Sequence, residues 1–309
     1  MANIFAINRC SSSVYRRFIV QFNSTQRFNS LSSHVSKSRF IKLNNLRRNC
    51  SLPSDAAAPF IVADDEKYGN KQVISITPRL YDYILANARE PPILRQLREE
   101  TANMRGSQMQ VSPDQAQLLA MLVQILGAAR CIELGVYTGY SSLAIALALP
   151  ESGCLVACER DAKSLEVAKR YYELAGVSHK VSVKHGLAAD VLKSMISNGE
   201  TCSSYDFAFV DAEKRMNQEY FELLLQLVRV GGVIVIDNVL WHGKVADPLV
   251  NDAKTVSIRN FNRNLMADDR VSISKKQVNQ ALKPTQPSVT SFEVDSDTEN
   301  IGLDICFVR

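Results

Sequence analysis

The feature that most constrains the fold is a series of five short apolar segments that alternate with helical patterns. The apolar segments are residues 130–135, 153–159, 180–186, 205–212 and 231–238, and the helical patterns between them are residues 140–149, 162–176, 187–196 and 220–230. Apolar strands alternating with helices are typical of a parallel sheet that is covered on both faces. The sequence therefore predicts a doubly wound α/β domain, in which ligands bind at the carboxyl ends of the strands.

Three further helices are expected before this sheet. Residues 77–104 predict two helices separated at Pro91 and Pro92, because proline interrupts a helix. Residues 112–128 predict a third, with Ser112 as its N-cap and Pro113 in its first helical position.

The turn after the first predicted strand, ELGVYTGYS, is a candidate ligand-binding turn. Gly135 and Gly139 would let the backbone approach a ligand, and the following helix N-terminus offers free N–H groups. A dinucleotide site would show GxGxxG, whereas here the spacing is GxxxG and Glu133 precedes it. An acid at this turn suits a ligand with a positive or amino-bearing end, and a tight packing turn is the alternative.

Glu159 ends the second predicted strand, where nucleotide-binding α/β proteins place an acid that accepts hydrogen bonds from ribose. The alternative is a solvent-facing glutamate. Glu159 as a ribose-binding acid, together with Glu133, indicates an adenosine-type ligand that carries an amino acid instead of a phosphate tail. S-adenosylmethionine fits that description.

Carboxylates also end the fourth and fifth predicted strands, at Asp211 and at Asp237 followed by Asn238. If these strands are neighbours they lie about 4.8 Å apart, and their terminal side chains converge. An all-oxygen set of this kind suits Mg²⁺, Mn²⁺ or Ca²⁺ better than zinc. The alternative is one helix N-cap and one turn residue.

Two residues near these carboxylates are candidates for contact with a substrate. Lys214 could act as a base if a nearby cation lowers its pKa, could orient a substrate oxygen, or could be a solvated lysine. Trp241, the only tryptophan, could stack on an aromatic substrate or belong to the core.

The first 54 residues differ in composition from the rest. They are rich in serine and contain no Asp or Glu, and they carry nine basic residues: Arg9, Arg16, Arg17, Arg27, Lys37, Arg39, Lys42, Arg47 and Arg48. This composition is typical of an organelle transit peptide, and a basic arm for nucleic acid is the alternative. The serine clusters and the segment RRNCSLPSDAAAP favour a plastid over a mitochondrion.

The charge of the remaining chain limits its partners. It has 27 basic against 32 acidic residues, a net charge near −5, so no basic excess is present to bind nucleic acid. No stretch approaches 18 consecutive apolar residues, so no membrane span is expected.

The segments ELGVYTGYS, VDAEK and VIDNVLW, in this order and spacing, resemble the cation-dependent O-methyltransferases of the plant caffeoyl-coenzyme A type. The resemblance runs from about Tyr81 to about Ser274. It implies a Rossmann-like, seven-stranded class I methyltransferase fold, a homodimer, S-adenosylmethionine and a divalent cation, with Mg²⁺ as the first choice. It also implies a catechol-like phenylpropanoid or flavonoid as the acceptor.

The same resemblance assigns roles to individual residues. Asp211, Asp237 and Asn238 would hold the cation, and Lys214 with Asp211 would serve catalysis. Contacts to the methyl donor would come from Val111, Glu133, Gly135, Val136, Ser141, Glu159, Ala188 and Asp211.

The chain departs from that family in three places. Glu213 replaces a usual Asp, Val111 stands where threonine is common, and residues 275–300 form a polar, aperiodic insertion before the last strand.

The expected organisation is a transit peptide at 1–54, a linker at 55–74 and a methyltransferase domain at 75–309. Because of the leader, a coenzyme A thioester substrate is not assumed.

Two other functions stay open at this point. A nicotinamide-dependent oxidoreductase of Rossmann type would need the turn after the first strand to hold a pyrophosphate. A catalytically silent methyltransferase-like subunit is conceivable because of the altered C-terminus.

Overall fold

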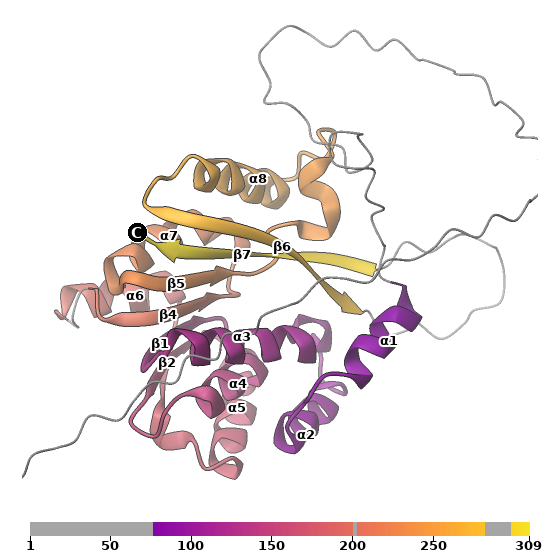
Figure 1. The fold of residues 1–309 in the computed structure, drawn as a ribbon, viewed down its shortest axis with the longest axis vertical. Coiled ribbons are helices and arrows are strands. Elements are labelled where there is room, and N and C mark those ends of the chain that lie inside the picture. Colours follow the sequence, from indigo (N-terminus) through magenta and orange to yellow (C-terminus); the bar gives the residue numbers. More distant parts are fainter. Residues whose placement is uncertain (1–76, 200–202, 282–297) are drawn as a thin grey trace, which may run out of the picture. The chain divides into compact units, whose positions relative to one another are not determined.

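A seven-stranded sheet organises the described part of the chain, residues 77–199, 203–281 and 298–309 (Figure 1). In the computed structural model the strand order is β3-β2-β1-β4-β5-β7-β6. The strands are β1 (Arg130–Leu134), β2 (Cys154–Glu159), β3 (Val181–His185), β4 (Tyr205–Val210), β5 (Val228–Ile236), β6 (Val271–Ala281) and β7 (Thr298–Val308). Strands β1 to β5 pair in parallel, and β7 is antiparallel to both β5 and β6. The predicted α/β fold class is confirmed.

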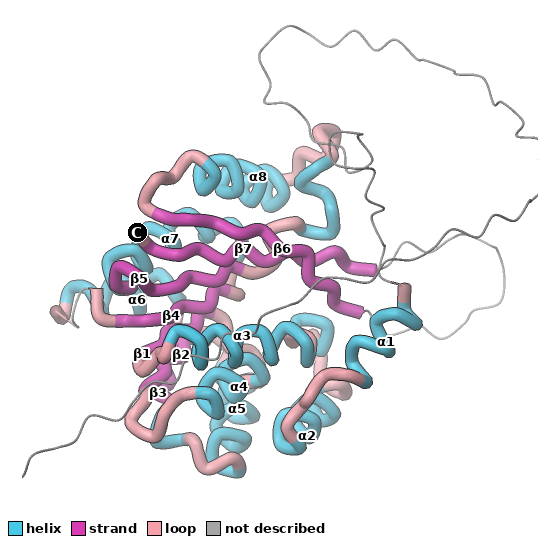
Figure 2. The backbone as a smooth tube through the Cα atoms, in the orientation of Figure 1, coloured by secondary structure: helices cyan, strands magenta, loops and turns pink. Residues whose placement is uncertain are grey.

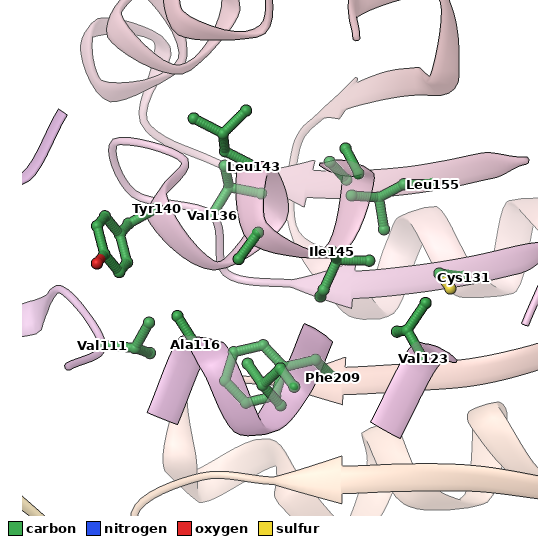
Figure 3. Packing of buried hydrophobic residues seen from close by; sticks show 14 of the residues in the cluster. Val111, Ala116, Val123, Cys131, Val136, Tyr140, Leu143, Ile145, Leu155 and Phe209 are labelled. Atoms are coloured by element: carbon green, nitrogen blue, oxygen red, sulfur yellow. The ribbon is translucent and has the colours of Figure 1, made fainter. Parts of the chain in front are cut away.

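Helices cover both faces of this sheet (Figure 2). Helices α2 (Pro92–Thr101), α3 (Pro113–Leu126), α4 (Tyr140–Ala148) and α5 (Ala162–Leu174) contribute to one apolar core, part of which Figure 3 shows. Helices α6 (Ala188–Ser197), α7 (Asn217–Leu227) and α8 (Ala253–Met266) contribute to the other. The remaining helices are α1 (Pro78–Ala86) and the short 3₁₀ helices η2 (Ser107–Met109), η3 (Ser178–Lys180), η4 (Lys214–Met216) and η5 (Trp241–Ala246).

The helices before the sheet begin where the sequence predicts. Helix α2 begins at Pro92 with Pro91 as its N-cap, and the Ser112 side chain accepts a hydrogen bond from the Gln115 N–H at the start of α3. One boundary differs, because residues 228–230, expected at the end of a helix, begin β5. Val228 and Val230 are β-branched, and such residues favour an extended strand.

Backbone hydrogen bonds continue past the carboxyl ends of the parallel strands. The N–H of Gly135 donates to the carbonyl of Cys158, that of Asp211 to Leu134, and that of Asp237 to Val210. The residues that follow β1, β4 and β5 are therefore held side by side at one edge of the sheet.

The C-terminal hairpin is longer than the sequence pattern indicates. Strand β6 continues to Ala281 and pairs with β7 from Thr298 onward, so part of the expected insertion at 275–300 is strand. Backbone pairing tolerates a polar, aperiodic sequence, which explains why the side-chain pattern did not predict these strands. The last strand is present, and its Asp304 pairs in register with Ile236 of β5.

Two of the sequence predictions lie outside the described residues: the transit peptide at 1–54 and the linker at 55–74. Within the described ranges, no helix is both long enough and apolar enough to cross a membrane.

Candidate active site

A cavity of about 1050 Å³ opens at the carboxyl ends of the parallel strands. This volume is at the upper end of the range for small-molecule sites, which is consistent with two ligands side by side. Eleven of the twelve predicted site residues line it: Val111, Gly135, Val136, Ser141, Glu159, Ala188, Asp211, Lys214, Asp237, Asn238 and Trp241. Glu133 is the exception.

The β1–α4 turn, residues 135–139, forms part of the cavity wall. Gly135 has φ +86°, and a Cβ atom there would lie 2.5 Å from the carbonyl oxygen of Asp211. Only glycine fits this contact, because the obstacle is backbone. The turn and the end of β4 are thus packed against each other.

Glu159 holds the same turn. One oxygen of its carboxylate accepts hydrogen bonds of 2.9 Å from the N–H groups of Val136 and Tyr137, and the other accepts from Arg160 and Asp161. Glu159 is therefore fixed at the cavity wall by four backbone donors. Its contact with ribose stays a prediction.

Glu133 lies beneath the turn instead of facing the cavity. It is the fourth residue of β1, its side chain is 0% exposed, and its Oε1 accepts a 2.5 Å hydrogen bond from Ser141 Oγ. Burial raises the pKa of Glu133 to about 8, so it is mostly protonated at neutral pH. Its Oε2 has no hydrogen-bond partner among the described residues, and a contact with the methionine end of a donor stays a prediction.

The ends of β4 and β5 bring together Asp211, Asp237 and Asn238. The two strands are neighbours in the sheet, as the sequence analysis assumed. Asp237 is 3% exposed, and its Oδ1 accepts a 2.6 Å hydrogen bond from the Asn238 N–H. Burial raises the pKa of both aspartates, and for Asp237 the nearby charge of Asp211 raises it further. Two carboxylates held together in this way favour a bound cation.

The donor set agrees with a hard divalent cation. It consists of two carboxylates and one amide, which are oxygen ligands of the kind that Mg²⁺, Mn²⁺ and Ca²⁺ prefer. Within the described ranges, no group of three or more His, Cys, Asp or Glu side chains could hold a metal ion by itself. A positive charge beside the pair comes from Lys214, whose Nζ forms an ion pair with Asp211 Oδ1. Both of these side chains are largely buried, with exposed fractions of 11% and 17%.

Trp241 lines the cavity and is not part of either core. Its ring lies 5.0 Å from that of His242, measured between centroids, with the planes tilted by 55°. The Nζ of Lys254, on the first turn of α8, lies 5.1 Å from the centroid of the indole. An aromatic and cationic group therefore borders the cavity next to Asn238.

Two residues that sequence reasoning missed bear on the chemistry of the site. Gln115 of α3 donates a 3.0 Å hydrogen bond to Asp237 Oδ2, and Lys254 lines the cavity. A polar Gln115 on an otherwise apolar face of α3 was a usable signal. Lys254 gave none, because a lysine in the first turn of a helix is ordinarily solvated.

Comparisons with known proteins agree with this geometry. A family model described as O-methyltransferase matches residues 85–283. Tricin synthase 1 of Oryza sativa subsp. japonica is 45% identical over 206 residues, which are 63% of this chain and 82% of the rice protein. Caffeoyl-CoA O-methyltransferase 1 of Zea mays is 41% identical over 221 residues, which are 68% of this chain and 84% of the maize protein.

Solved structures give the same result. An O-methyltransferase from Bacillus cereus in complex with SAH is 31% identical, with a TM-score of 0.62, covering 74% of this chain and 96% of that one. The O-methyltransferase TomG from Streptomyces achromogenes, in complex with SAM, is 30% identical, with a TM-score of 0.61. The match covers 74% of this chain and 94% of TomG.

The fold and the site define a class I methyltransferase that uses S-adenosylmethionine. The chain belongs to the O-methyltransferase family, and plant caffeoyl-CoA O-methyltransferases are among its relatives. The resemblance seen in the sequence is confirmed. Family membership also decides against the nicotinamide-dependent alternative.

Proposed function

We propose that this enzyme transfers a methyl group from S-adenosylmethionine to a hydroxyl of a catechol-like aromatic, a phenylpropanoid or flavonoid, with the help of a divalent cation. The observation that carries the proposal is the buried pair Asp211 and Asp237, held by backbone hydrogen bonds beside the β1–α4 turn. The names of the relatives, tricin synthase and caffeoyl-CoA O-methyltransferase, support a phenolic acceptor.

The donor would bind along the β1–α4 turn. Glu159 would receive the ribose hydroxyls, Val111, Gly135, Val136 and Ser141 would line the path of the methionine, and Ala188 would border the adenine. Glu133, mostly protonated at neutral pH, would meet the amino acid end from below the turn. In this binding mode the reacting methyl group would lie near the end of β4, next to Asp211.

Asp211, Asp237 and Asn238 would hold the cation, with Mg²⁺ as the first choice and Mn²⁺ or Ca²⁺ as alternatives. When bound, such a cation stabilises the phenolate form of a diphenol and fixes its oxygens for in-line attack. Gln115 and the Asn238 N–H fix the orientation of Asp237, so its carboxylate needs little rearrangement to bind a cation.

Lys214, whose amine lies beside Asp211 within the cavity, would receive the proton of the acceptor hydroxyl in its neutral form, which the positive charge of a cation at Asp211 and Asp237 would favour. A cation bound by Asp211 would compete for that carboxylate and release the lysine. Trp241 would stack on the aromatic ring of the acceptor.

Methyl transfer from labelled donor to 3,4-dihydroxycinnamate and to a flavonoid with vicinal hydroxyls tests the proposal. We expect transfer to require added Mg²⁺ or Mn²⁺ and to vanish in Asp237→Ala, with the exposed Asp269→Ala as the matched control. Full activity in excess chelator would contradict the role of the cation. A folded protein that binds no donor in calorimetry would instead favour a catalytically silent subunit.

A homodimer and a plastid location also belong to the proposal. The dimer rests on the family resemblance and is checked by light scattering on the purified protein. The location rests on the composition of residues 1–54, and a fluorescent reporter fused after residue 54 distinguishes plastid from mitochondrion.

A further inference from the structure

The segment after β5 carries unusual backbone conformations next to the proposed cation ligands. Asn238, Trp241 and His242 have φ values of 60°, 45° and 55°, in the left-handed region that side-chain-bearing residues avoid. Asparagine tolerates this conformation better than most residues, so the strain falls mainly on Trp241 and His242. Strained conformations persist only where other contacts hold them, and such strain is typical of functional sites.

The apolar cores do not provide those contacts. Neither apolar core includes a side chain from residues 241–250, and Leu249 is 86% exposed. Hydrogen bonds to backbone carbonyls hold the loop that carries Trp241.

Arg259 of α8 supplies most of these contacts. Its Nε donates to the carbonyl of Val245 at 3.0 Å, and its Nη2 donates to the carbonyls of Asp247 at 2.8 Å and Val250 at 2.9 Å. A longer hydrogen bond, 3.3 Å, reaches the carbonyl of Lys244. One guanidinium thus binds four carbonyls from seven consecutive residues, and charged donors make stronger hydrogen bonds than neutral ones.

Asn262, on the same helix, holds the beginning of the segment. Its Nδ2 donates a 2.7 Å hydrogen bond to the carbonyl of Val239. From the other side, the Val239 N–H donates to the carbonyl of Gly302 in β7. Gly302 also packs closely on Leu240, because a Cβ atom at this glycine would lie 2.1 Å from Leu240 Cγ. Residues 239–250 are therefore fixed before and after the strained Trp241 and His242.

We propose that Arg259 and Asn262 are positioning residues that hold Trp241 and His242 at the acceptor side of the cavity. Neither Arg259 nor Asn262 lines the cavity, so each acts through the loop and not by touching the acceptor. The effect on the acceptor rests on the proposed function, whereas the effect on the loop does not.

Trp241 makes the inference directly measurable, because it is the only tryptophan of the chain. Quenching of its fluorescence by acrylamide reports how well the loop is held, without any turnover. Arg259→Met removes the donors and keeps the length of the side chain. Arg263→Met, an exposed arginine one turn further along α8, is the matched control.

We expect Arg259→Met to increase the quenching constant of Trp241 and to raise the KM for the diphenol roughly tenfold, because a misplaced binding group costs one to two orders of magnitude. The dissociation constant of the donor should change less than about twofold, since Arg259 contacts no part of the β1–α4 turn. Arg259→Lys keeps the charge and some of the donors, so its quenching constant and its KM should lie between those of the wild type and of Arg259→Met. Arg263→Met should behave as the wild type.

Asn262→Ala tests the other contact and keeps the proposal falsifiable if Arg259→Met does not fold. It should also increase quenching, because it releases the carbonyl of Val239. A merely structural role for both residues would lower Tm while leaving the quenching of Trp241 and the KM for the diphenol unchanged, and that result would overturn the inference. If no diphenol is methylated at all, the proposed function fails, and the quenching measurements still decide on the positioning role.

Discussion

Gln115 on α3 and Asp237 at the end of β5 are 122 residues apart in sequence and are joined by a buried hydrogen bond of 3.0 Å between Nε2 and Oδ2. Only 3% of the surface of each residue is exposed. The bond fixes the Asp237 carboxylate from the side of the sheet opposite to α7 and α8. It lowers the pKa of Asp237, while burial and Asp211 act more strongly in the opposite direction.

We expect Gln115→Leu to weaken cation binding by about 10- to 100-fold, as loss of an outer partner of a metal-ligating carboxylate typically does. The measurement is the Mn²⁺ concentration that gives half-maximal activity, together with calorimetric titration of Mn²⁺. Gln117→Leu is the control, because Gln117 lies on the same helix and lines no part of the cavity. An unchanged Mn²⁺ affinity in Gln115→Leu would show that Asp237 needs no such support.

Gly135→Ala should abolish donor binding and destabilise the fold. The substitution places a Cβ atom 2.5 Å from the carbonyl oxygen of Asp211 and imposes an unfavourable φ of +86°. The matched control is Gly127→Ala, where φ is +60° and nothing lies within 4 Å, so that only the conformational cost of about 1–2 kcal/mol applies. Urea unfolding and calorimetry with S-adenosylmethionine measure both effects. Equal destabilisation of the two variants would rule out the steric contact.

The sequence predicts the parallel strands and the residues at their ends, because apolar runs that stop at polar residues are a local signal. Asp211, Asp237 and Glu159 were found in this way, and all three line the cavity. The burial of Glu133 beneath the turn was not predicted, because it depends on α4, whose Ser141 donates a hydrogen bond to this carboxylate, and the local sequence of β1 carries no signal for that contact.

The loop after β5 and the C-terminal hairpin could not be predicted for a different reason. Arg259 binds carbonyls between nine and fifteen residues before it, and backbone acceptors carry no sequence pattern. The pairing of residues 275–281 with 298–304 likewise uses backbone groups. Such contacts depend on the three-dimensional path of the chain, which the local sequence does not encode.

Glu133 predicts a specific dependence of stability on pH. Its pKa rises from 4.5 to about 8 in the folded state, chiefly because of burial, so the folded protein binds this proton more tightly than the unfolded chain. The stabilisation is therefore complete below about pH 4.5 and is lost as the pH rises through about 8, at up to about 1.4 kcal/mol per pH unit.

Glutamine does not titrate, so Glu133→Gln should remove the part of the pH dependence of stability that comes from Glu133. We expect the free energy of unfolding of the wild type to fall, relative to Glu133→Gln, between pH 5.5 and pH 8.5, measured with urea in the presence of chelator and without donor. Glu166→Gln, at an exposed glutamate of α5, is the control. Parallel pH profiles for wild type and Glu133→Gln would contradict the raised pKa.

Lys214 can be tested as a base with two substitutions. Arginine keeps the positive charge beside Asp211 but cannot give up its proton at neutral pH, whereas methionine removes both functions. If Lys214 accepts the proton of the acceptor hydroxyl, Lys214→Arg and Lys214→Met should both lower kcat by about 100-fold or more, because this is the usual contribution of a general base. Donor affinity, measured by calorimetry, should stay close to that of the wild type in Lys214→Arg. Single-turnover rates complete the test, since they separate the methyl-transfer step from substrate binding and product release. Retention of most of the activity in Lys214→Arg would instead assign the lysine the role of orienting the acceptor oxygen through its charge.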